Sequence, residues 1–509
     1  MSFEILETDL LGRIGKIKTK RGYLETPALL PVIHPVKQEV SLDEIKKIGF
    51  KGIITNAYIT MKYYSNLAKE KGIHALLNFE GIIMTDSGGY QILNYGDIDV
   101  EPERIAEYEK AIKTDIAVIL DTPTGFTKDK VKAKATVMKT LEAAKRTIKL
   151  LEDKEGILWC GTIQGGRFLD LLEYSTRELV SMNFDLLALG SPTEFMESYN
   201  FEILAKMILK AKMNMPLDKP LHLFGAGHPL TIPLGVALGC DLFDSASYIL
   251  YAKSLRYLSE YGTYELKSLN YFPCICPICS NFTPKELLED KDRVKKLALH
   301  NLYNLMEEIR RVKQAIKDGR LWDYLSVKAH FHPNLKKAFN LIADNSSLLE
   351  DGTPLFKPKA IFFKEEEDLK RPEFLRFKDR IKDINLPNKD IAIIIQSPKD
   401  SPLILSNLFK KLKKELKNAQ FFALINPWGI LPVEITDLYP FSQYLCSLNP
   451  KELIMGEVKD LILSKNYKKI YIFYWDDEWV EIIRKIENLR ENVKVIKSRN
   501  YKDLLKEVN

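Results

Sequence analysis

The chain has 509 residues, of which 46% are hydrophobic and 28% charged, the composition of an ordinary globular protein. That length exceeds what one hydrophobic core usually serves and predicts about three domains, while the formal net charge of +6 permits a nucleic-acid partner without requiring one. The first residues lack a secretory signal, no apolar run approaches the length of a spanning helix, and cysteine is scarce, so we expect a cytoplasmic protein without a membrane partner.

Eight short apolar runs in the first 250 residues have the length and composition of buried strands. They lie at residues 29–33, 51–55, 81–85, 115–120, 157–163, 184–189, 220–224 and 240–243. Amphipathic stretches of helical period, such as 129–151 and 168–182, separate most of them. Eight alternations of strand and helix over this span predict a (β/α)8 TIM barrel. A doubly wound open sheet is the alternative, but it usually has fewer strands and a Gly-rich first turn, which this chain lacks.

Polar residues and glycines follow the ends of these strands. Asp86, Asp121 and Asp244 each follow a strand, Gln164 follows another, and Gly190 a further one. In a barrel these C-terminal strand ends converge on one face, where active sites are built. A single Asp in such a place is most simply a helix N-cap. Three of them, joined by Gly-rich segments, predict instead a pocket lined by carboxylates and an amide.

Carboxylates at such a face predict chemistry at a sugar carbon. One Asp can attack the anomeric carbon while a second moves protons, with a covalent glycosyl-enzyme intermediate. A third Asp and the Gln offer acceptors and donors to the edge of a flat heterocycle, and Tyr90 and Phe224 could stack on its faces. Base exchange on a nucleoside fits these groups, and simple hydrolysis fits almost as well from residue types alone.

Three thiols and one imidazole further along the chain have the spacing of a metal site. Cys274, Cys276 and Cys279 fall within six positions, and His300 follows on a predicted helix. Cys3His is a standard closed ligand set for structural zinc, and it leaves no position open for catalysis. We therefore expect one structural Zn²⁺ per chain, rather than three unrelated structural cysteines.

Beyond residue 330 the sequence pattern changes. Strands are expected at 391–395, 421–425, 470–475 and 493–496, with an amphipathic helix at 403–417 and another helix between the last two strands. The predicted fold class is thus α/β, a (β/α)8 barrel with a zinc subdomain, followed by α+β C-terminal domains. The domain bounds we expect are 1–330 for the barrel with its zinc subdomain at about 270–305, 331–390 for a connector with short elements, and 391–509 for a small α/β domain.

Several strings of the barrel resemble those of the tRNA-guanine transglycosylases, specifically the archaeal type. The matching strings are Thr-Asp-Ser-Gly-Gly-Tyr-Gln (85–91), Thr-Ile-Gln-Gly-Gly (162–166), His-Leu-Phe-Gly-Ala-Gly-His-Pro (222–229), Asp-Leu-Phe-Asp-Ser-Ala-Ser-Tyr (241–248), Tyr-Phe-Pro-Cys-Ile-Cys-Pro-Ile-Cys (271–279) and Leu-His-Asn-Leu-Tyr (299–303). They cover residues 10 to 320 in the family's order. A stretch at 421–434 resembles the second region of the archaeal enzymes.

The resemblance implies a reaction. Archaeal members replace guanine 15 in the D-arm of tRNA with 7-cyano-7-deazaguanine, also called preQ0, as the first step of archaeosine formation. By position, Asp244 is similar to the family nucleophile that attacks C1′ of the ribose, and Asp86 to the general acid/base. The resemblance also implies base-binding positions, which are Asp121, Gln164, Gly190, Ser191, Tyr90 and Phe224.

The run after Gly190 departs from the usual archaeal pattern. Archaeal relatives usually continue with a second glycine and two valines, whose backbone amides face the cyano group. Here Ser191, Pro192 and Thr193 follow, and Pro192 has no N–H. The way the 7-substituent is held, and the preferred deazaguanine, are therefore left open by the sequence.

The resemblance also bears on partners. The family pairs through its zinc region, so we expect a homodimer. Many archaeal members carry a C-terminal RNA-binding PUA domain, and we find no stretch for it up to Asn509. The expected partners are thus tRNA, 7-cyano-7-deazaguanine, a second copy of the chain, and a PUA-domain protein supplied separately if one is needed.

Other functions stay open at this stage. A non-catalytic RNA-binding partner subunit would keep the fold and zinc, but it would not need all three aspartates. A related enzyme that modifies the inserted base should lack barrel aspartates and carry another Cys motif in the C-terminal half, which Cys446 alone does not supply. A generic nucleoside hydrolase would need neither the zinc loop nor the C-terminal third.

Overall fold

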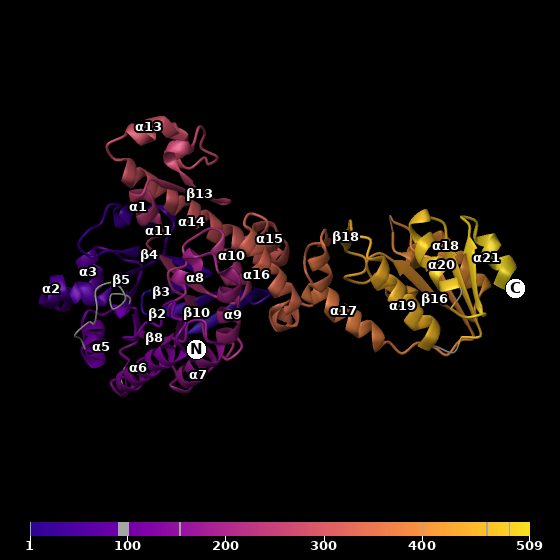
Figure 1. The fold of residues 1–509 in the computed structure, drawn as a ribbon, viewed down its shortest axis with the longest axis horizontal. Coiled ribbons are helices and arrows are strands. Elements are labelled where there is room, and N and C mark those ends of the chain that lie inside the picture. Colours follow the sequence, from indigo (N-terminus) through magenta and orange to yellow (C-terminus); the bar gives the residue numbers. More distant parts are fainter. Residues whose placement is uncertain are drawn as a thin grey trace. The chain divides into compact units, whose positions relative to one another are not determined.

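A computed structural model describes residues 2–89, 101–151, 154–399, 401–464, 467–487 and 489–508 (Figure 1). The contacts within the chain divide it into two compact units, residues 1–354 and residues 355–509. Helix α16 (Pro333–Asp344) belongs to the first unit, where it packs on α9 (Phe201–Lys212) and α15 (Leu321–Ala329).

The first unit is built around a closed barrel of eight parallel strands, which confirms the predicted fold class. The strands are β4 (Ala28–Ile33), β5 (Gly52–Asn56), β6 (Ile82–Asp86), β7 (Ile116–Val118), β8 (Leu158–Ile163), β9 (Leu186–Leu189), β10 (Leu221–Leu223) and β11 (Leu242–Ser245). They follow one another around the barrel in chain order, and β11 closes it by pairing with β4. All eight coincide with the predicted apolar runs.

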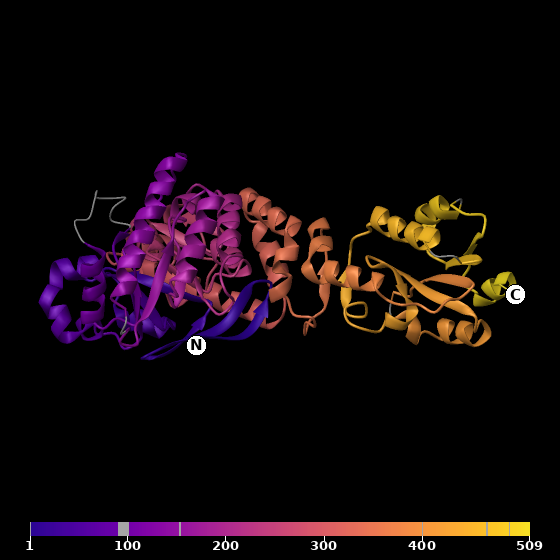
Figure 2. The same ribbon diagram turned by 90° about the horizontal axis from the view of Figure 1, so that it is seen from below.

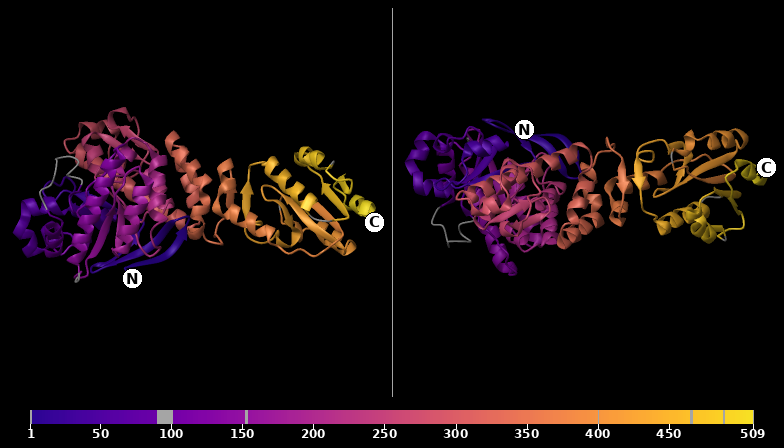
Figure 3. Two further views of the ribbon diagram at one scale, coloured as in Figure 1. Left: turned by 60° about the horizontal axis from the view of Figure 1, so that its bottom comes forward. Right: turned by 90° about the horizontal axis from the view of Figure 1, so that it is seen from above.

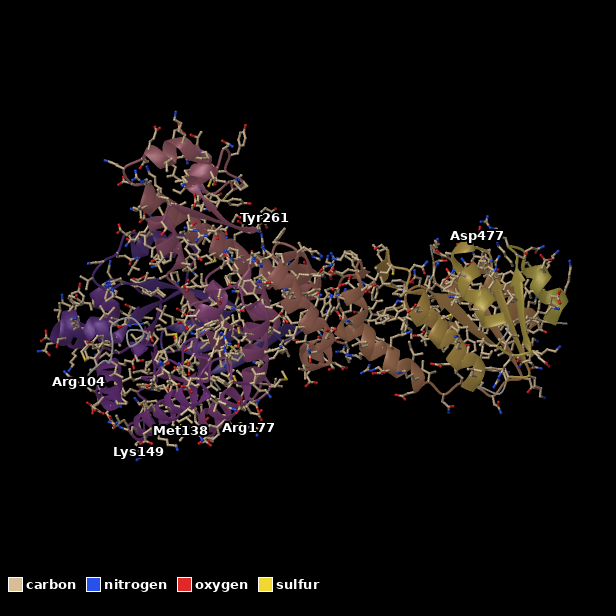
Figure 4. The ribbon with its side chains drawn as sticks, viewed as in Figure 1. Arg104, Met138, Lys149, Arg177, Tyr261 and Asp477 are labelled. Atoms are coloured by element: carbon tan, nitrogen blue, oxygen red, sulfur yellow. The ribbon has the colours of Figure 1, made fainter. Side chains whose placement is uncertain are left out.

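Helices surround the barrel. They are α1 (Leu42–Ile48), α2 (Ala57–Lys71), α3 (Ile73–Leu77), α5 (Pro102–Ala111), α6 (Lys130–Lys149), α7 (Leu169–Ser181), α8 (Thr193–Glu197), α9, α10 (Thr231–Ala237) and α11 (Ser247–Lys253). The Asp129 carboxylate caps α6 by accepting from the N–H groups of the first turn. The exposed side of α6 carries Met138 and Lys149, which Figure 4 labels on the outer surface. No helix of the described residues is long and apolar enough to cross a membrane.

A three-stranded antiparallel sheet closes one end of the barrel and was not predicted from the sequence. Its strands are β1 (Phe3–Asp9), β2 (Gly12–Thr19) and β3 (Gly22–Thr26), drawn in indigo in Figures 2 and 3. Phe3, Ile17 and Leu24 of this sheet pack in one cluster with residues that begin barrel strands, such as Ile82 and Leu242. Because the sheet covers the end where strands begin, the opposite end is left for a site.

After the last barrel strand comes a small hairpin and a group of helices. These elements are β12 (Arg256–Ser259), β13 (Gly262–Glu265), α12 (Pro277–Asn281), α13 (Pro284–Glu289), α14 (Arg293–Lys317), α15 and α16. The long helix α14 lies against α11 and β12, and α12 and α13 lie against α14 (Figure 1). Helix α13 has a capping box formed by Thr283 and Glu286.

The second unit is a five-stranded sheet with helices on both faces. Its strands are β15 (Ile391–Gln396), β16 (Ala419–Ile425), β17 (Gly429–Pro432), β19 (Lys469–Tyr474) and β20 (Val493–Lys497), in the order β17-β16-β15-β19-β20. Only β17 is antiparallel to its neighbour, because it returns from β16 by a short turn. The four strands predicted here agree with β15, β16, β19 and β20, whereas β17 was not foreseen.

The helices of this unit form two layers. Helices α17 (Pro372–Lys382), α18 (Asn407–Glu415) and α21 (Tyr501–Val508) pack with one side of the sheet, and α19 (Lys451–Ser464) and α20 (Val480–Glu487) with the other. Figure 2 shows these two layers on either side of the strands. A two-stranded parallel pair, β14 (Ile361–Phe363) and β18 (Tyr444–Cys446), lies beside them.

Candidate active site

Three aspartates meet at the C-terminal end of the barrel. Asp86 is the last residue of β6, Asp121 follows β7, and Asp244 lies in β11. Burial, followed by the charges of Asp121 and Asp244, raises the pKa of Asp86 to about 7. Because the two other carboxylates contribute to this rise, all three lie close enough to interact. The strand ends thus bring these side chains together as the sequence predicted.

Asp86 is held by a neighbouring strand. The Nδ2 group of Asn56, at the end of β5, donates to Asp86 Oδ2 at 3.1 Å, and the two residues are paired in the parallel ladder. Asn56 also caps α2 through its Oδ1 atom, which fixes its side chain. With a pKa of about 7, Asp86 can both give and take a proton near neutral pH.

Asp121 and Gln164 form a locked pair. Gln164 Nε2 donates to Asp121 Oδ2 at 2.6 Å. Gln164 Oε1 accepts from the Thr124 N–H at 2.9 Å and from Ser191 Oγ at 3.0 Å. Burial raises the pKa of Asp121 to about 6, although the bond from Gln164 opposes the rise. The pair therefore presents a fixed carboxylate edge, which is the complement of a heterocycle with adjacent N–H donors.

Two glycines give this pair the room it needs. A Cβ atom at Gly89 would lie 2.0 Å from Asp121 Oδ1, and one at Gly190 would lie 2.3 Å from Gln164 Nε2. Neither distance is possible for a real side chain, so any larger residue would displace the Asp121–Gln164 pair. The glycines of the strand-end motifs are thus explained by steric contact with the pair.

Ser191 connects two of the strand-end loops. Its backbone adopts the left-handed region at φ 58°, and its Oγ accepts from the Gly125 N–H at 3.1 Å while donating to Gln164 Oε1. Pro192 then precedes the short helix α8 as its N-cap residue. The Ser-Pro run after Gly190 therefore serves to hold Gln164 through a hydroxyl.

Asp244 is oriented by a histidine that the sequence analysis did not single out. His222 Nε2 lies 2.9 Å from Asp244 Oδ1, and the Gly225 N–H donates to the same oxygen at 3.0 Å. An ionised carboxylate only accepts, so His222 Nε2 carries the proton of this bond. Within the described part of the chain no group donates to Oδ2. One oxygen of Asp244 is thus fixed and the other is left for chemistry.

The floor of the site is apolar. Phe224 packs against the barrel-interior cluster that includes Met84, Val118 and Cys160, and its ring lies 4.7 Å from that of His222. This position suits an aromatic side chain that covers one face of a planar ligand. Tyr90, the second predicted stacking residue, lies outside the described residues.

Sequence reasoning missed Asn56 and His222, the two residues that position the aspartates. Each carries a usable signal, because Asn56 ends a barrel strand and His222 lies within one, next to the strand that carries Asp244. Asn56 belongs to none of the recognised strings, and His222 opens one of them without any sign of its role, so only the barrel register shows which aspartate each residue contacts. Strand order would have been needed to find them.

The predicted metal ligands lie together at the start of the helical region. The ligand atoms of Cys274, Cys276, Cys279 and His300 all fall within 4.8 Å of one another. His300 Nδ1 is 3.4 Å from Cys276 Sγ and 3.3 Å from Cys279 Sγ. Around a tetrahedral zinc ion, ligand atoms are roughly 3.4–3.8 Å apart, so the set fits such an ion.

The surroundings of His300 also suit a metal ligand. Its Nε2 lies 2.8 Å from the Leu258 carbonyl oxygen, to which it donates, and the Tyr257 ring stacks on the imidazole at 3.8 Å. That bond places the proton on Nε2 and leaves the lone pair of Nδ1 facing the thiols, the usual second-sphere arrangement of a bound histidine.

A protein-family model and individual relatives of this chain point to the same family. A model of the protein family described as "Queuine tRNA-ribosyltransferase" matches residues 9–334. A tRNA-guanine(15) transglycosylase of Sulfolobus acidocaldarius is 44% identical over 481 residues, which cover 92% of this chain and 94% of the relative. Proteins of the same name from Saccharolobus solfataricus and Methanococcus aeolicus are 42% and 39% identical, covering 92% and 98% of this chain and 96% and 74% of their own.

Proposed function

For this chain, which belongs to the queuine tRNA-ribosyltransferase family, we propose that guanine 15 of tRNA is exchanged for 7-cyano-7-deazaguanine through a covalent intermediate on Asp244. The chain is a tRNA-guanine transglycosylase, and its relatives are named tRNA-guanine(15) transglycosylases. The identity of the incoming base, the nucleophile and the roles of the other residues are the proposal.

The first half of the reaction breaks the bond between base and ribose. The free Oδ2 of Asp244 attacks C1′ of the guanosine, the C1′–N9 bond breaks, and the ribose remains as an ester of Asp244. The bond from His222 keeps the other oxygen in place. Asp86, in its protonated form, gives its proton to the departing guanine, so the leaving base is neutral.

The second half reverses these steps with a different base. The ionised Asp86 takes the N9 proton of the incoming deazaguanine, whose N9 then attacks C1′ and releases the Asp244 carboxylate. A single group with a pKa of about 7 can serve both halves, because its two protonation states are close in free energy at neutral pH. No proton is gained or lost over the cycle.

Asp121 and Gln164 select the base. The Oδ1 atom of Asp121 accepts from N–H groups on the edge of guanine or deazaguanine, while Gln164 holds Oδ2. Phe224, and Tyr90 from outside the described residues, are proposed to stack on the faces of the base, with the Gly190 and Ser191 turn beside its 7-position. A guanine within folded tRNA must be unstacked to reach these residues.

One observation carries the proposal above all. The Asp244 carboxylate has one oxygen fixed by two donors and the other free, and it lies near Asp86, whose pKa of about 7 suits proton transfer. A non-catalytic partner subunit would have no use for this arrangement. An enzyme that modifies the inserted base would have no use for a nucleophile aimed at C1′.

We also propose that the cluster of Cys274, Cys276, Cys279 and His300 holds one structural Zn²⁺. When bound, the ion ties the loop of α12 to α14 and takes no part in the reaction. The expectations of a homodimer and of a separately supplied PUA domain remain predictions.

The direct test is exchange of radiolabelled guanine into transcribed tRNA. Wild type is expected to incorporate label, an Asp244→Asn variant to incorporate none, and a transcript with another base at position 15 to remain unlabelled. Unlabelled 7-cyano-7-deazaguanine is expected to displace label irreversibly. Asp244→Asn keeps an acceptor for His222 and Gly225, so its fold should persist. Full activity of this variant would overturn the assignment of the nucleophile.

A further inference from the structure

The net positive charge of the chain comes from one of its two units. Residues 355–509 contain 29 Lys and Arg against 23 Asp and Glu, whereas residues 1–354 contain 46 of each. The first unit, which holds the candidate active site, is thus formally neutral, and the whole net charge of +6 lies on the second unit. A neutral barrel gives little long-range attraction to a polyanion such as RNA.

Within the second unit, lysines gather on helix α18. This helix buries Phe409 and Leu412 against the sheet, and Leu416 just beyond its end is buried too. From residue 410 to residue 417 the exposed side chains are five lysines and one glutamate, Glu415. We name five exposed residues the lysine face, and these are Lys410, Lys411, Lys413, Lys414 and Lys417.

In the described part of the chain no carboxylate pairs with the lysine face, and this includes Glu415 of the same helix. Among the described residues, none of its five ammonium groups lies in a salt bridge, and Lys411 instead lies over the Tyr501 ring at 5.3 Å. On the other side of the sheet, Lys451 of α19 and Lys485 of α20 both pair with Glu481. Helix α18 therefore differs from α19 and α20, because its lysines are unpaired whereas Lys451 and Lys485 each have a carboxylate partner.

Like charges at these spacings oppose helix formation. Lys410 lies three and four positions before Lys413 and Lys414, and each such pair costs a few tenths of a kcal/mol. The helix persists because its apolar side is buried. Lysine is a compact point charge that binds phosphate oxygens without selecting a base. A row of them unpaired on one helix side is the electrostatic arrangement of a surface for a nucleic-acid backbone.

We propose that the lysine face contacts the sugar–phosphate backbone of the tRNA substrate. The inference rests on the proposed function for the identity of the RNA. It assigns attraction of the RNA to the second unit and recognition of the base to the barrel. Because phosphate contacts carry no sequence information, this surface would favour tRNA over small substrates without choosing among tRNAs.

The test uses the full-length chain with four substitutions to glutamine. Lys410, Lys413, Lys414 and Lys417 are changed together, since glutamine has nearly the helix propensity of lysine and all four side chains are exposed. The matched control removes the same number of charges from the other side of the sheet, at Lys451, Lys459, Arg484 and Lys485. Binding of transcribed tRNA is followed by fluorescence anisotropy between about 50 and 200 mM salt.

The lysine-face variant is expected to bind tRNA at least about tenfold more weakly. Each phosphate contact contributes roughly 0.7–0.9 to the slope of log affinity against log salt concentration, so the loss of four contacts should make this slope smaller by about 3. Its KM for tRNA should rise while kcat at saturating tRNA stays within twofold. The control variant should match wild type. Equal losses in both variants, or no loss in the first, would overturn the proposal.

The outcomes separate this inference from the proposed function. If wild type exchanges guanine and the lysine-face variant binds tRNA as tightly as wild type, only the inference fails. If wild type binds tRNA through the lysine face but exchanges no guanine, the inference stands and the proposed reaction fails.

Discussion

Replacing Asp86 with asparagine should stabilise the barrel, and by more at high pH than at low pH. In the native state the pKa of Asp86 is raised from an ordinary value of 3.8 to about 7, by burial first and then by Asp121 and Asp244. The folded protein therefore binds the Asp86 proton more tightly than the unfolded chain does. Between pH 4 and 7 the native state holds more protons, so this group lowers stability as pH rises through that window.

The magnitude follows from the two pKa values. Ionising Asp86 in the folded state costs nothing below about pH 4, about 2 kcal/mol at pH 5, and about 4 kcal/mol above pH 7. An Asp86→Asn variant escapes this cost while its amide oxygen still accepts from Asn56. The gain in unfolding free energy should thus be larger at pH 8 than at pH 5 by roughly 2–3 kcal/mol.

Hydrogen–deuterium exchange of the barrel strands, measured at both pH values, isolates this unit from residues 355–509. The gain should shrink in an Asp244→Asn background, since that change removes one of the charges that raise the pKa of Asp86. An equal gain at pH 5 and pH 8 would refute the reasoning, because it would mean that Asp86 is ionised throughout this range.

Three further predictions concern binding, orientation and metal. Gln164→Leu leaves Asp121 without its 2.6 Å donor, so the KM for the base should rise about 10–100-fold in steady-state exchange, the effect of unpairing a buried polar group. His222→Phe removes a charge-assisted bond to Asp244, so kcat should fall about 10–100-fold with little change in the KM for the base. Cys276→Ser should reduce zinc, measured by mass spectrometry of the metal, to well below one ion per chain and lower the melting temperature.

The histidine prediction has a matched control elsewhere in the barrel unit. His74 Nε2 lies 3.0 Å from Asp115 Oδ2, another buried histidine–aspartate pair, but Asp115 precedes β7 and so lies at the other end of the barrel. His74→Phe should lower stability without the drop in kcat at matched folded concentration. A similar loss of kcat in both variants would show that His222 acts only through stability.

Much of the barrel was predictable because its strands are buried on both faces. Such strands appear as continuous apolar runs, and the polar residue that ends each one was visible for Asp86, Asp121 and Gln164. The zinc ligands were predictable for a different reason, since three of them lie in one short loop. Local sequence signals were sufficient in both cases.

The elements that sequence reasoning missed depend on distant contacts. The buried positions of β1 and β2 are irregularly spaced, so the sequence shows no clear strand pattern there. That these strands cover one end of the barrel is evident only from the packing of Phe3 and Ile17 against the barrel interior. His222 stood in a recognised string, but its role was hidden because its partner Asp244 is 22 positions away and is reached through strand pairing. The function of Ser191 was likewise hidden, since its hydroxyl binds groups on two other strand-end loops.

The most direct test of the central claim is to trap the enzyme–RNA ester and locate it. Wild-type protein mixed with transcribed tRNA is quenched in denaturant and digested with nuclease and protease, and the peptides are sequenced by mass spectrometry. The account predicts a ribose-linked peptide whose modified residue is Asp244, absent from the Asp244→Asn variant. An ester on Asp86, or exchange that proceeds without any ester on Asp244, would contradict it.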